Sequence, residues 1–251
     1  MNHRLSPLSL ALCASLSLGL LAACGKKEEP AAEAPSLAAA RDPEALKKAA
    51  EVQRVASLPQ ADPATPVDAY KRIDSGNQLM YLYYAVSGLP ADMGQIAERL
   101  SQDYRATQDG FKRQDILKVL EPRVKADIAA AGGQRYVIWE ADNQLIDSYD
   151  FERKHFPVKP GFWNGDTRFY YNDNSAYQIS FSGAEKLRSL PVGDESLARE
   201  IEPKVNRYDA MTLRVYAFVQ DADLNGKSVK AQVVKLELLD KKGKLLASTS
   251  L

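Results

Sequence analysis

The chain has 251 residues, of which 45% are hydrophobic and 26% are charged, a composition typical of one soluble globular domain. Basic and acidic side chains each total 33, and this balance argues against a domain that neutralises nucleic-acid phosphates. Because Cys13 and Cys24 both lie near the N-terminus, we expect the folded part to have no disulfide, no thiol nucleophile and no cysteine-containing zinc site.

Residues 1–23 have the pattern of a secretory signal peptide, with Arg4 in the positively charged segment and an uncharged apolar stretch from Leu5 to Leu21. The end of this stretch, Leu21-Ala22-Ala23-Cys24, resembles the lipobox of bacterial lipoproteins. The resemblance implies that the chain is cleaved before Cys24 and that this cysteine carries three acyl chains. Such a protein is anchored to a membrane without spanning it.

The residue after the cysteine gives an indication of the compartment. In lipoproteins of Gram-negative bacteria, a residue other than Asp at this position usually permits transport to the outer membrane, so Gly25 favours the periplasmic face of that membrane. An uncleaved signal anchor and ordinary cleavage that leaves a free cysteine are the alternatives, and both predict that Cys24 carries no lipid.

Residues 24–66 are predicted to be the lipidated cysteine and a tether, because they are rich in Ala, Pro and Glu and contain no aromatic residue. A flexible coil of ~42 residues has an r.m.s. reach of roughly 35 Å. Asp42 and Pro43 are suited to start a short helix within this segment. A plain spacer and a helix that docks on the domain or on a partner are the two interpretations.

The remaining residues, 67–251, are predicted to form a single domain that begins with helices. Apolar residues recur at helical spacing over residues 67–87, 93–104 and 111–131. Asp92 is the expected cap of the second helix, and Pro122 is expected to kink or split the third.

After Gly133 the hydrophobic period changes from 3.6 to 2, and 12 of the 21 aromatic residues fall between Tyr136 and Phe181. The expected strands are residues 135–141, 145–156, 167–171, 176–182, 210–220 and 228–239, with a shorter one after residue 243 and a helical interruption at residues 184–202. This order predicts an α+β fold in which N-terminal helices pack on a mostly antiparallel C-terminal sheet.

The segment most suggestive of ligand binding contains Phe162, Trp163, Arg168 and Tyr170. Aromatic rings on a loop beside amides and a guanidinium group are suited to stack a sugar or clasp a peptide. The alternative is an Asn-Gly turn whose neighbouring rings belong to the core, and the exposure of Trp163 distinguishes the two.

Asp221, Asp223 and Asn225 resemble the first ligands of an EF-hand calcium loop, followed by Gly226. The twelfth position is Gln232 instead of the bidentate glutamate, and the flanks are predicted strands. A simple hairpin turn at Asn225-Gly226 explains the segment equally well.

Catalytic motifs are scarce. His155 is the only histidine after the signal segment, and no Gly-x-Ser-x-Gly or His-Glu-x-x-His motif accompanies it, so a half-buried strand histidine is expected. Five carboxylates in the first two predicted strands could supply a glycosidase pair, or could lie on solvated strand faces. They are Glu140, Asp142, Asp147, Asp150 and Glu152.

The last hairpin is rich in lysine. Such lysines either discourage pairing between sheet edges or form a surface for an anionic envelope polymer. They are Lys227, Lys230, Lys235, Lys241, Lys242 and Lys244.

The sequence therefore favours a non-catalytic, lipid-anchored module that binds an envelope protein or polymer. It indicates no cofactor and no nucleic-acid partner. A hydrolase of the envelope that uses carboxylates or a calcium ion is the alternative from a different class.

Overall fold

The computed structural model describes residues 42–165, 167–207 and 210–251. The signal segment and the lipobox, including Cys24, lie outside these ranges. The chain divides into two units, Met1–Gln53 and Arg54–Leu251. Helix α1 (Pro43–Ala56) begins at the expected position, where the Asp42 carboxylate accepts the main-chain N–H of Glu44 at 2.9 Å. None of the described helices has both the length and the apolarity needed to cross a membrane.

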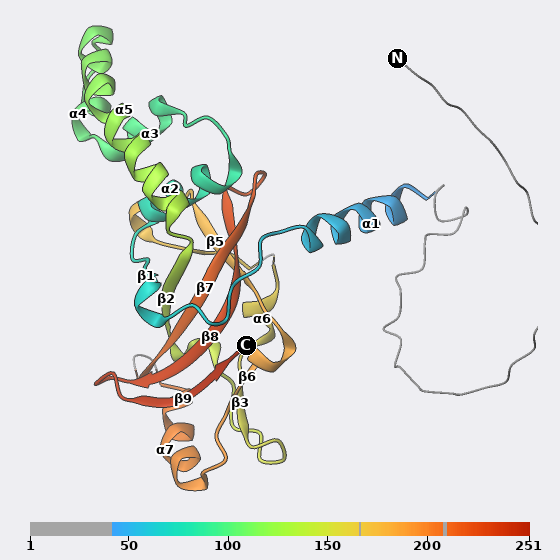
Figure 1. Cartoon of the computed structure of the whole chain (residues 1–251). Coiled ribbons are helices and arrows are strands. Elements are labelled where there is room, and N and C mark those ends of the chain that lie inside the picture. Colours follow the sequence, from blue (N-terminus) through green and yellow to red (C-terminus); the bar gives the residue numbers. More distant parts are fainter. Residues whose placement is uncertain (1–41, 166, 208–209) are drawn as a thin grey trace, which may run out of the picture. The chain divides into compact units, whose positions relative to one another are not determined.

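The unit Arg54–Leu251 is built around a long, curled hairpin (Figure 1). The main sheet has the strand order β1-β2-β7-β8-β5-β4, and β9 also pairs with β8. All its pairs are antiparallel except β1 with β2 and β5 with β8. Its strands are β1 (Lys71–Arg72), β2 (Tyr136–Asp142), β4 (Phe169–Tyr170), β5 (Gln178–Ser182), β7 (Met211–Asp223), β8 (Ser228–Asp240) and β9 (Leu245–Ser250).

Most helices lie at the two ends of this hairpin, α2 to α5 near the turn between β7 and β8 and α7 at the opposite end, whereas α6 lies beside β5 (Figure 1). Together with the mostly antiparallel sheet they confirm the predicted α+β class. The helices are α2 (Gly76–Ser87), α3 (Met93–Leu100), α4 (Gln102–Ala106), α5 (Gly110–Gly133), α6 (Pro160–Trp163) and α7 (Glu195–Val205).

The first predicted helix begins later than expected. Residues 67–75 form a 3₁₀ turn and β1, and α2 starts at Gly76. The reason is a capping box: the Ser75 hydroxyl accepts the N–H of Asn77, and the Gln78 side chain accepts the N–H of Ser75. The apolar residues Tyr70 and Ile73 therefore belong to extended chain and not to a helix.

The other two helices are close to the expectation. Asp92 caps α3 as predicted, but Ser101 caps a separate short helix, so the second segment is divided into α3 and α4. Pro122 lies inside α5, which continues as one helix through it, contrary to a split.

The predicted strand 145–156 is wrong over most of its length. Its residues form a 3₁₀ turn, two isolated bridges and the start of β3 (His155–Pro157), which pairs with β6 (Ser189–Pro191). The Asp150 carboxylate accepts the N–H groups of Glu152 and Arg153, and Lys154 has a positive φ of 55°. This local turn chemistry outweighs the alternating pattern.

The predicted helical interruption 184–202 is also shorter than expected, because β6 occupies its middle. Asp194 then caps α7 through the N–H groups of Ser196 and Leu197, as the sequence indicated.

The core lies on the inner face of the curled sheet. There Trp139 of β2 pairs with Val215 of β7, and Leu79 and Met80 of α2, which packs against β7, belong to the same buried cluster. Burial of a large apolar side chain contributes about 1.5–3 kcal/mol each.

Residues 59–62, which precede β1, lie along the face of the sheet opposite the core. The main-chain N–H of Ala61 donates to Gln232, that of Asp62 donates to the Tyr136 hydroxyl, and Gln220 donates to the carbonyl of Pro59. Residues 59–62 thus contact the sheet, while the spacer role of the preceding residues stays a prediction.

Candidate functional site

The ring-bearing segment lies mostly in the core. Phe162 has no exposed surface and stacks on Phe181 with ring centroids 4.9 Å apart, and Trp163 is 9% exposed. The buried indole favours the core interpretation of these rings, and neither can stack on a surface ligand. Arg168 is used in an ion pair with Asp223 at 2.7 Å. Tyr170, by contrast, is 55% exposed.

The segment with EF-hand resemblance forms the turn between β7 and β8. Asp221 forms an ion pair with Arg54. The Asp223 carboxylate forms an ion pair with Arg168 and also accepts the main-chain N–H of Asn225. A calcium ion would have to displace both arginines. Within the described ranges, no group of three or more His, Cys, Asp or Glu residues is arranged to hold a metal ion.

The five carboxylates are not gathered into one cleft, because most of the second predicted strand is a loop. Asp147 lies 3.9 Å from Lys159. Hydrogen bonds from the main chain of Arg153 and Glu152 lower the pKa of Asp150, the opposite of what a general acid needs. His155 lies 3.9 Å from Asp150 and its side chain is 17% exposed.

The lysines of the last hairpin are also dispersed. Lys235 pairs with Glu237 at 2.6 Å, and Lys227 lies over the Tyr177 ring. Because β8 pairs on both sides, its lysines do not guard a free edge; Lys241, Lys242 and Lys244 lie in or next to the turn before β9.

One strand edge in the main sheet is open. On the side of β1, the carbonyl of Tyr136 accepts a hydrogen bond from the Gln134 side chain, and that of Ile138 accepts one from the main-chain N–H of Ile73. On the other side, the carbonyl of Arg135 accepts the N–H of Val219 in β7, the strand next to β2. Since main-chain groups alternate along a strand, the N–H and C=O of Glu140 point away from β7. Among the described residues neither group has a hydrogen-bond partner.

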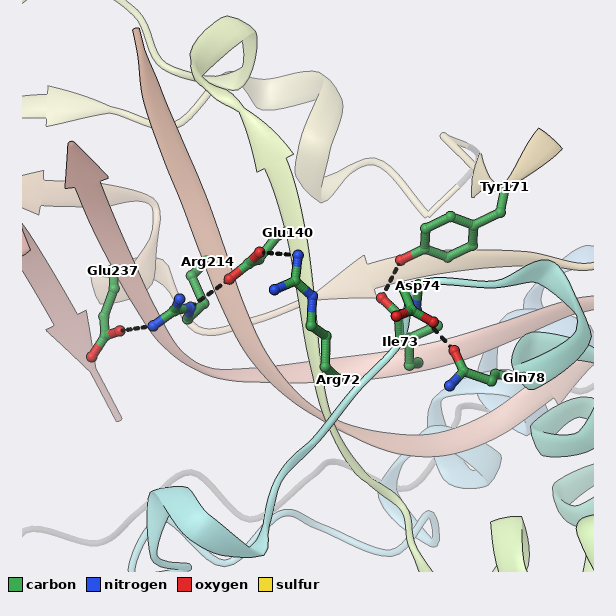
Figure 2. Close-up of polar contacts among 8 residues, drawn as sticks. All are labelled: Arg72, Ile73, Asp74, Gln78, Glu140, Tyr171, Arg214 and Glu237. Carbon is green, nitrogen blue, oxygen red and sulfur yellow. Dashed lines mark hydrogen bonds and ion pairs between the residues drawn. The ribbon is translucent and has the colours of Figure 1, made fainter. Parts of the chain in front are cut away.

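The Tyr171 hydroxyl lies at the point where β1 stops short of Glu140. In a continued parallel ladder, the carbonyl of Ile73 would receive the N–H of Glu140. The Tyr171 hydroxyl instead donates to this carbonyl at 2.6 Å (Figure 2). Burial, with Asp74 nearby, raises the pKa of Tyr171 to about 12, so the hydroxyl remains a donor at neutral pH.

The other end of the sheet has a matching open edge. The N–H of Gln178 donates to Lys227 on the side of β8, so Ile179 faces β4 and bonds its partner Phe169. The N–H and C=O of Tyr170 therefore point away from β5. No partner for them is found in the part of the chain that the structure describes.

The two open edges line one hollow of about 370 Å³, which we call the strand-edge groove. Trp139 and Phe169 lie in contact beneath it, with ring centroids 4.8 Å apart. A second hollow of about 290 Å³ continues along Glu140–Asp142 toward Thr212. The lining of the groove comprises Trp139, Glu140, Ala141, Asp142, Gln144, Leu145, Phe169, Tyr170 and Tyr171.

A row of alternating charges holds β2 in position beside this groove. Arg72 contacts Glu140 at 2.6 Å, Glu140 accepts from Arg214 at 2.7 Å, and Arg214 lies 3.7 Å from Glu237 (Figure 2). Burial alone lowers the pKa of Arg214, but the hydrogen bonds to Glu140 and Tyr216 outweigh it and the net pKa is raised. The charge of Glu140 is thus neutralised within the protein.

Asp142 differs from Glu140. Its carboxylate accepts only the main-chain and side-chain N–H groups of Gln144, at 3.0 and 2.7 Å. Within the described ranges no basic side chain forms an ion pair with it. The groove therefore combines free main-chain groups, aromatic walls and one carboxylate without a cation.

Sequence reasoning identified Tyr170 and, for a different purpose, Glu140 and Asp142. It missed the groove because the side to which a main-chain group points depends on pairing between distant segments. The one available signal was the pair of opposite charges, Glu140 and Arg214, each flanked by apolar residues in its strand.

Comparisons with protein-family models, with curated proteins and with solved structures find no match to this chain.

Proposed function

We propose that the protein is a lipid-anchored, non-catalytic component of the bacterial cell envelope, at the periplasmic face of the outer membrane, that binds an extended segment of another envelope protein. The Leu21–Cys24 pattern and Gly25 support the anchor and the compartment. Several acyl chains on Cys24 give lasting attachment, whereas one chain binds only marginally.

The binding mode rests on a single observation: Glu140 and Tyr170, whose outward main-chain groups have no partner among the described residues, both line the strand-edge groove. An unpaired strand edge is a template for another strand, and peptides that add to such an edge gain affinity from main-chain hydrogen bonds. A segment laid between β2 and β4 bonds both edges at once.

The side chains of the groove define the preferred segment. The rings of Trp139 and Phe169 offer an apolar floor, and the exposed ring of Tyr170 offers a wall. A small apolar side chain at alternate positions fits this floor, since successive residues of a strand point to opposite faces. A lysine or arginine at the end near Asp142 supplies the missing cation.

Hydrogen exchange tests the binding mode. The mature chain carrying Cys24→Ser, which removes the lipid, is mixed with Val-Thr repeat hexapeptides that have lysine at either end. We expect slower exchange at Glu140 and Tyr170 at millimolar peptide. The same peptides with alternate prolines, which lack half of the donors, should give no protection.

A matched pair of variants separates main-chain from ring recognition. Tyr170→Pro and Tyr170→Ala both remove the ring, but only proline removes the outward N–H, and that N–H makes no bond within the sheet. Weaker binding by Tyr170→Pro than by Tyr170→Ala supports the proposal. Equal binding by the two, or protection elsewhere with Glu140 unaffected, contradicts it.

The anchor is tested separately by mass spectrometry of the protein extracted from membranes. The expected N-terminal peptide begins at Cys24 with three acyl chains, and Cys24→Ala should release the protein from the membrane. An unmodified cysteine, or a precursor that keeps residues 1–23, refutes the anchor without affecting the groove.

A further inference from the structure

A third hollow, apart from the two beside β2, lies between α2, α5 and β1, and we call it the α2–α5 groove. Its volume is about 440 Å³, within the range of roughly 300–1,000 Å³ that small-molecule sites occupy. The buried side chains Ile73, Leu82 and Val137 form its floor, and Ala130 and Ala131 of α5 line one wall. The side chains of this floor are all apolar.

The rim of this groove carries an excess of positive charge. Lys71, Arg72 and Arg123 line it, against one carboxylate, Asp127. Asp127 is already engaged, because the Arg123 guanidinium lies 3.9 Å from its carboxylate. Arg72 is held by Glu140, whereas no ion pair of Lys71 is found among the described residues.

Two amides at the rim have their acceptor atoms occupied. The Gln78 oxygen accepts the N–H of Asp74 (Figure 2) and also that of Ser75, and the Asn77 oxygen accepts from Asn174 at 3.0 Å. Each amide therefore retains its NH₂ group for a ligand, and these groups are donors only. Donors and cations together favour an anion.

We propose that the α2–α5 groove binds a single-chain anionic amphiphile, with its acidic head at Lys71 and the amides Asn77 and Gln78 and its apolar chain on the floor beside Ala130. The pairing of an apolar surface with convergent donors and a cation matches the two ends of such a molecule. This site is separate from the strand-edge groove, and either proposal can fail without the other.

The test uses three probes with the same ten-carbon chain: decanoate, decanol and decyltrimethylammonium. Calorimetric titration of the mature chain carrying Cys24→Ser, below the micelle concentration of each probe, should detect decanoate and give no binding of the cationic probe. Lys71→Gln should weaken decanoate binding about two- to fivefold, as expected for an exposed charge.

Two alanines of α5 give a matched pair. Ala130→Leu places a larger side chain at the wall of the groove and should lower decanoate affinity at least about tenfold, since it removes the space for the chain. Ala129→Leu adds the same group at an exposed position outside the lining and should have no effect. Thermal melting of both variants confirms that they fold.

Several outcomes overturn the proposal. They are absence of decanoate binding, equal affinity for decyltrimethylammonium, and unchanged binding by Ala130→Leu. A further arm uses vesicles of phosphatidylglycerol: if they bind the protein and Ala130→Leu binds them equally, the cations recognise a membrane surface and the groove has no part in it.

Discussion

The row of alternating charges beside the strand-edge groove allows us to predict how much Glu140→Gln lowers the free energy of unfolding. The Glu140 side chain is 15% exposed and contacts two arginines of different exposure, Arg214 at 32% and Arg72 at 61%. Glutamine keeps the shape of the side chain and one acceptor oxygen but removes the charge. Arg214 then retains only Glu237, at 3.7 Å, as an acidic neighbour.

The exposed fractions of the paired side chains determine how much unfolding free energy is lost when each ion pair is broken. Breaking a fully buried pair costs about 3–5 kcal/mol, whereas exposed pairs contribute about 0.2–1 kcal/mol. The pair of Glu140 with Arg214 lies between these limits, so we expect Glu140→Gln to lower the free energy of unfolding by about 1–3 kcal/mol. The pair with Arg72 is mostly exposed, and Arg72→Gln should cost at most about 1 kcal/mol.

Urea denaturation of the two variants and of a double-mutant cycle with Arg214→Gln measures these terms. For a unit of this size, each kcal/mol corresponds to a shift in Tm of about 2–4 °C. A coupling energy between Glu140 and Arg214 below about 0.5 kcal/mol, or an equal cost for Arg72→Gln, refutes the reasoning. Peptide binding should survive Glu140→Gln, because the main-chain groups that bind the peptide remain.

Three further predictions concern single positions. Gly76→Ala places a Cβ 2.9 Å from the Asn174 Cβ and in contact with the Asn174 carbonyl, so we expect a loss of about 1–3 kcal/mol in urea denaturation. Gly226→Ala places a Cβ against the flexible Arg168 guanidinium instead, and its cost should be no more than about 1 kcal/mol. Burial raises the pKa of Asp173, but hydrogen bonds from Ser75 and Gly76 outweigh it and hold the pKa below 3.8. The native state therefore gains stability above the unfolded pKa and loses it as the pH falls through the folded value. Asp173→Asn should make Tm depend less on pH in the acid range, measured by thermal denaturation at a series of pH values. An unchanged pH dependence of Tm contradicts the assignment.

The sequence predicted the parts of the fold that local chemistry specifies. Caps are the clearest case: Asp92 and Asp194 begin α3 and α7 as expected, since a carboxylate that accepts free N–H groups acts within one turn. The long β7–β8 hairpin follows equally well from its alternating apolar residues.

The errors arise where two local signals compete. Tyr70 and Ile73 fit a helical period, but the capping box at Ser75 starts the helix after them. Residues 145–156 alternate like a strand, but the Asp150 carboxylate stabilises a turn in their middle. In both cases a few hydrogen bonds to main-chain N–H groups, each contributing about 0.5–1.5 kcal/mol, outweigh a weak periodic preference.

The strand-edge groove depends on information of a different kind. Glu140 is open because β1 ends early, and at the end of β1 a hydroxyl from Tyr171, 98 positions away from Ile73, donates to the carbonyl that the N–H of Glu140 would reach in a longer ladder. Tyr171→Phe frees this carbonyl. If the N–H of Glu140 then pairs with Ile73, peptide affinity should fall although stability changes little. The Tyr171 hydroxyl would thus help to leave the N–H of Glu140 without a partner in the free protein, and a bound segment would accept the hydrogen bond from this N–H.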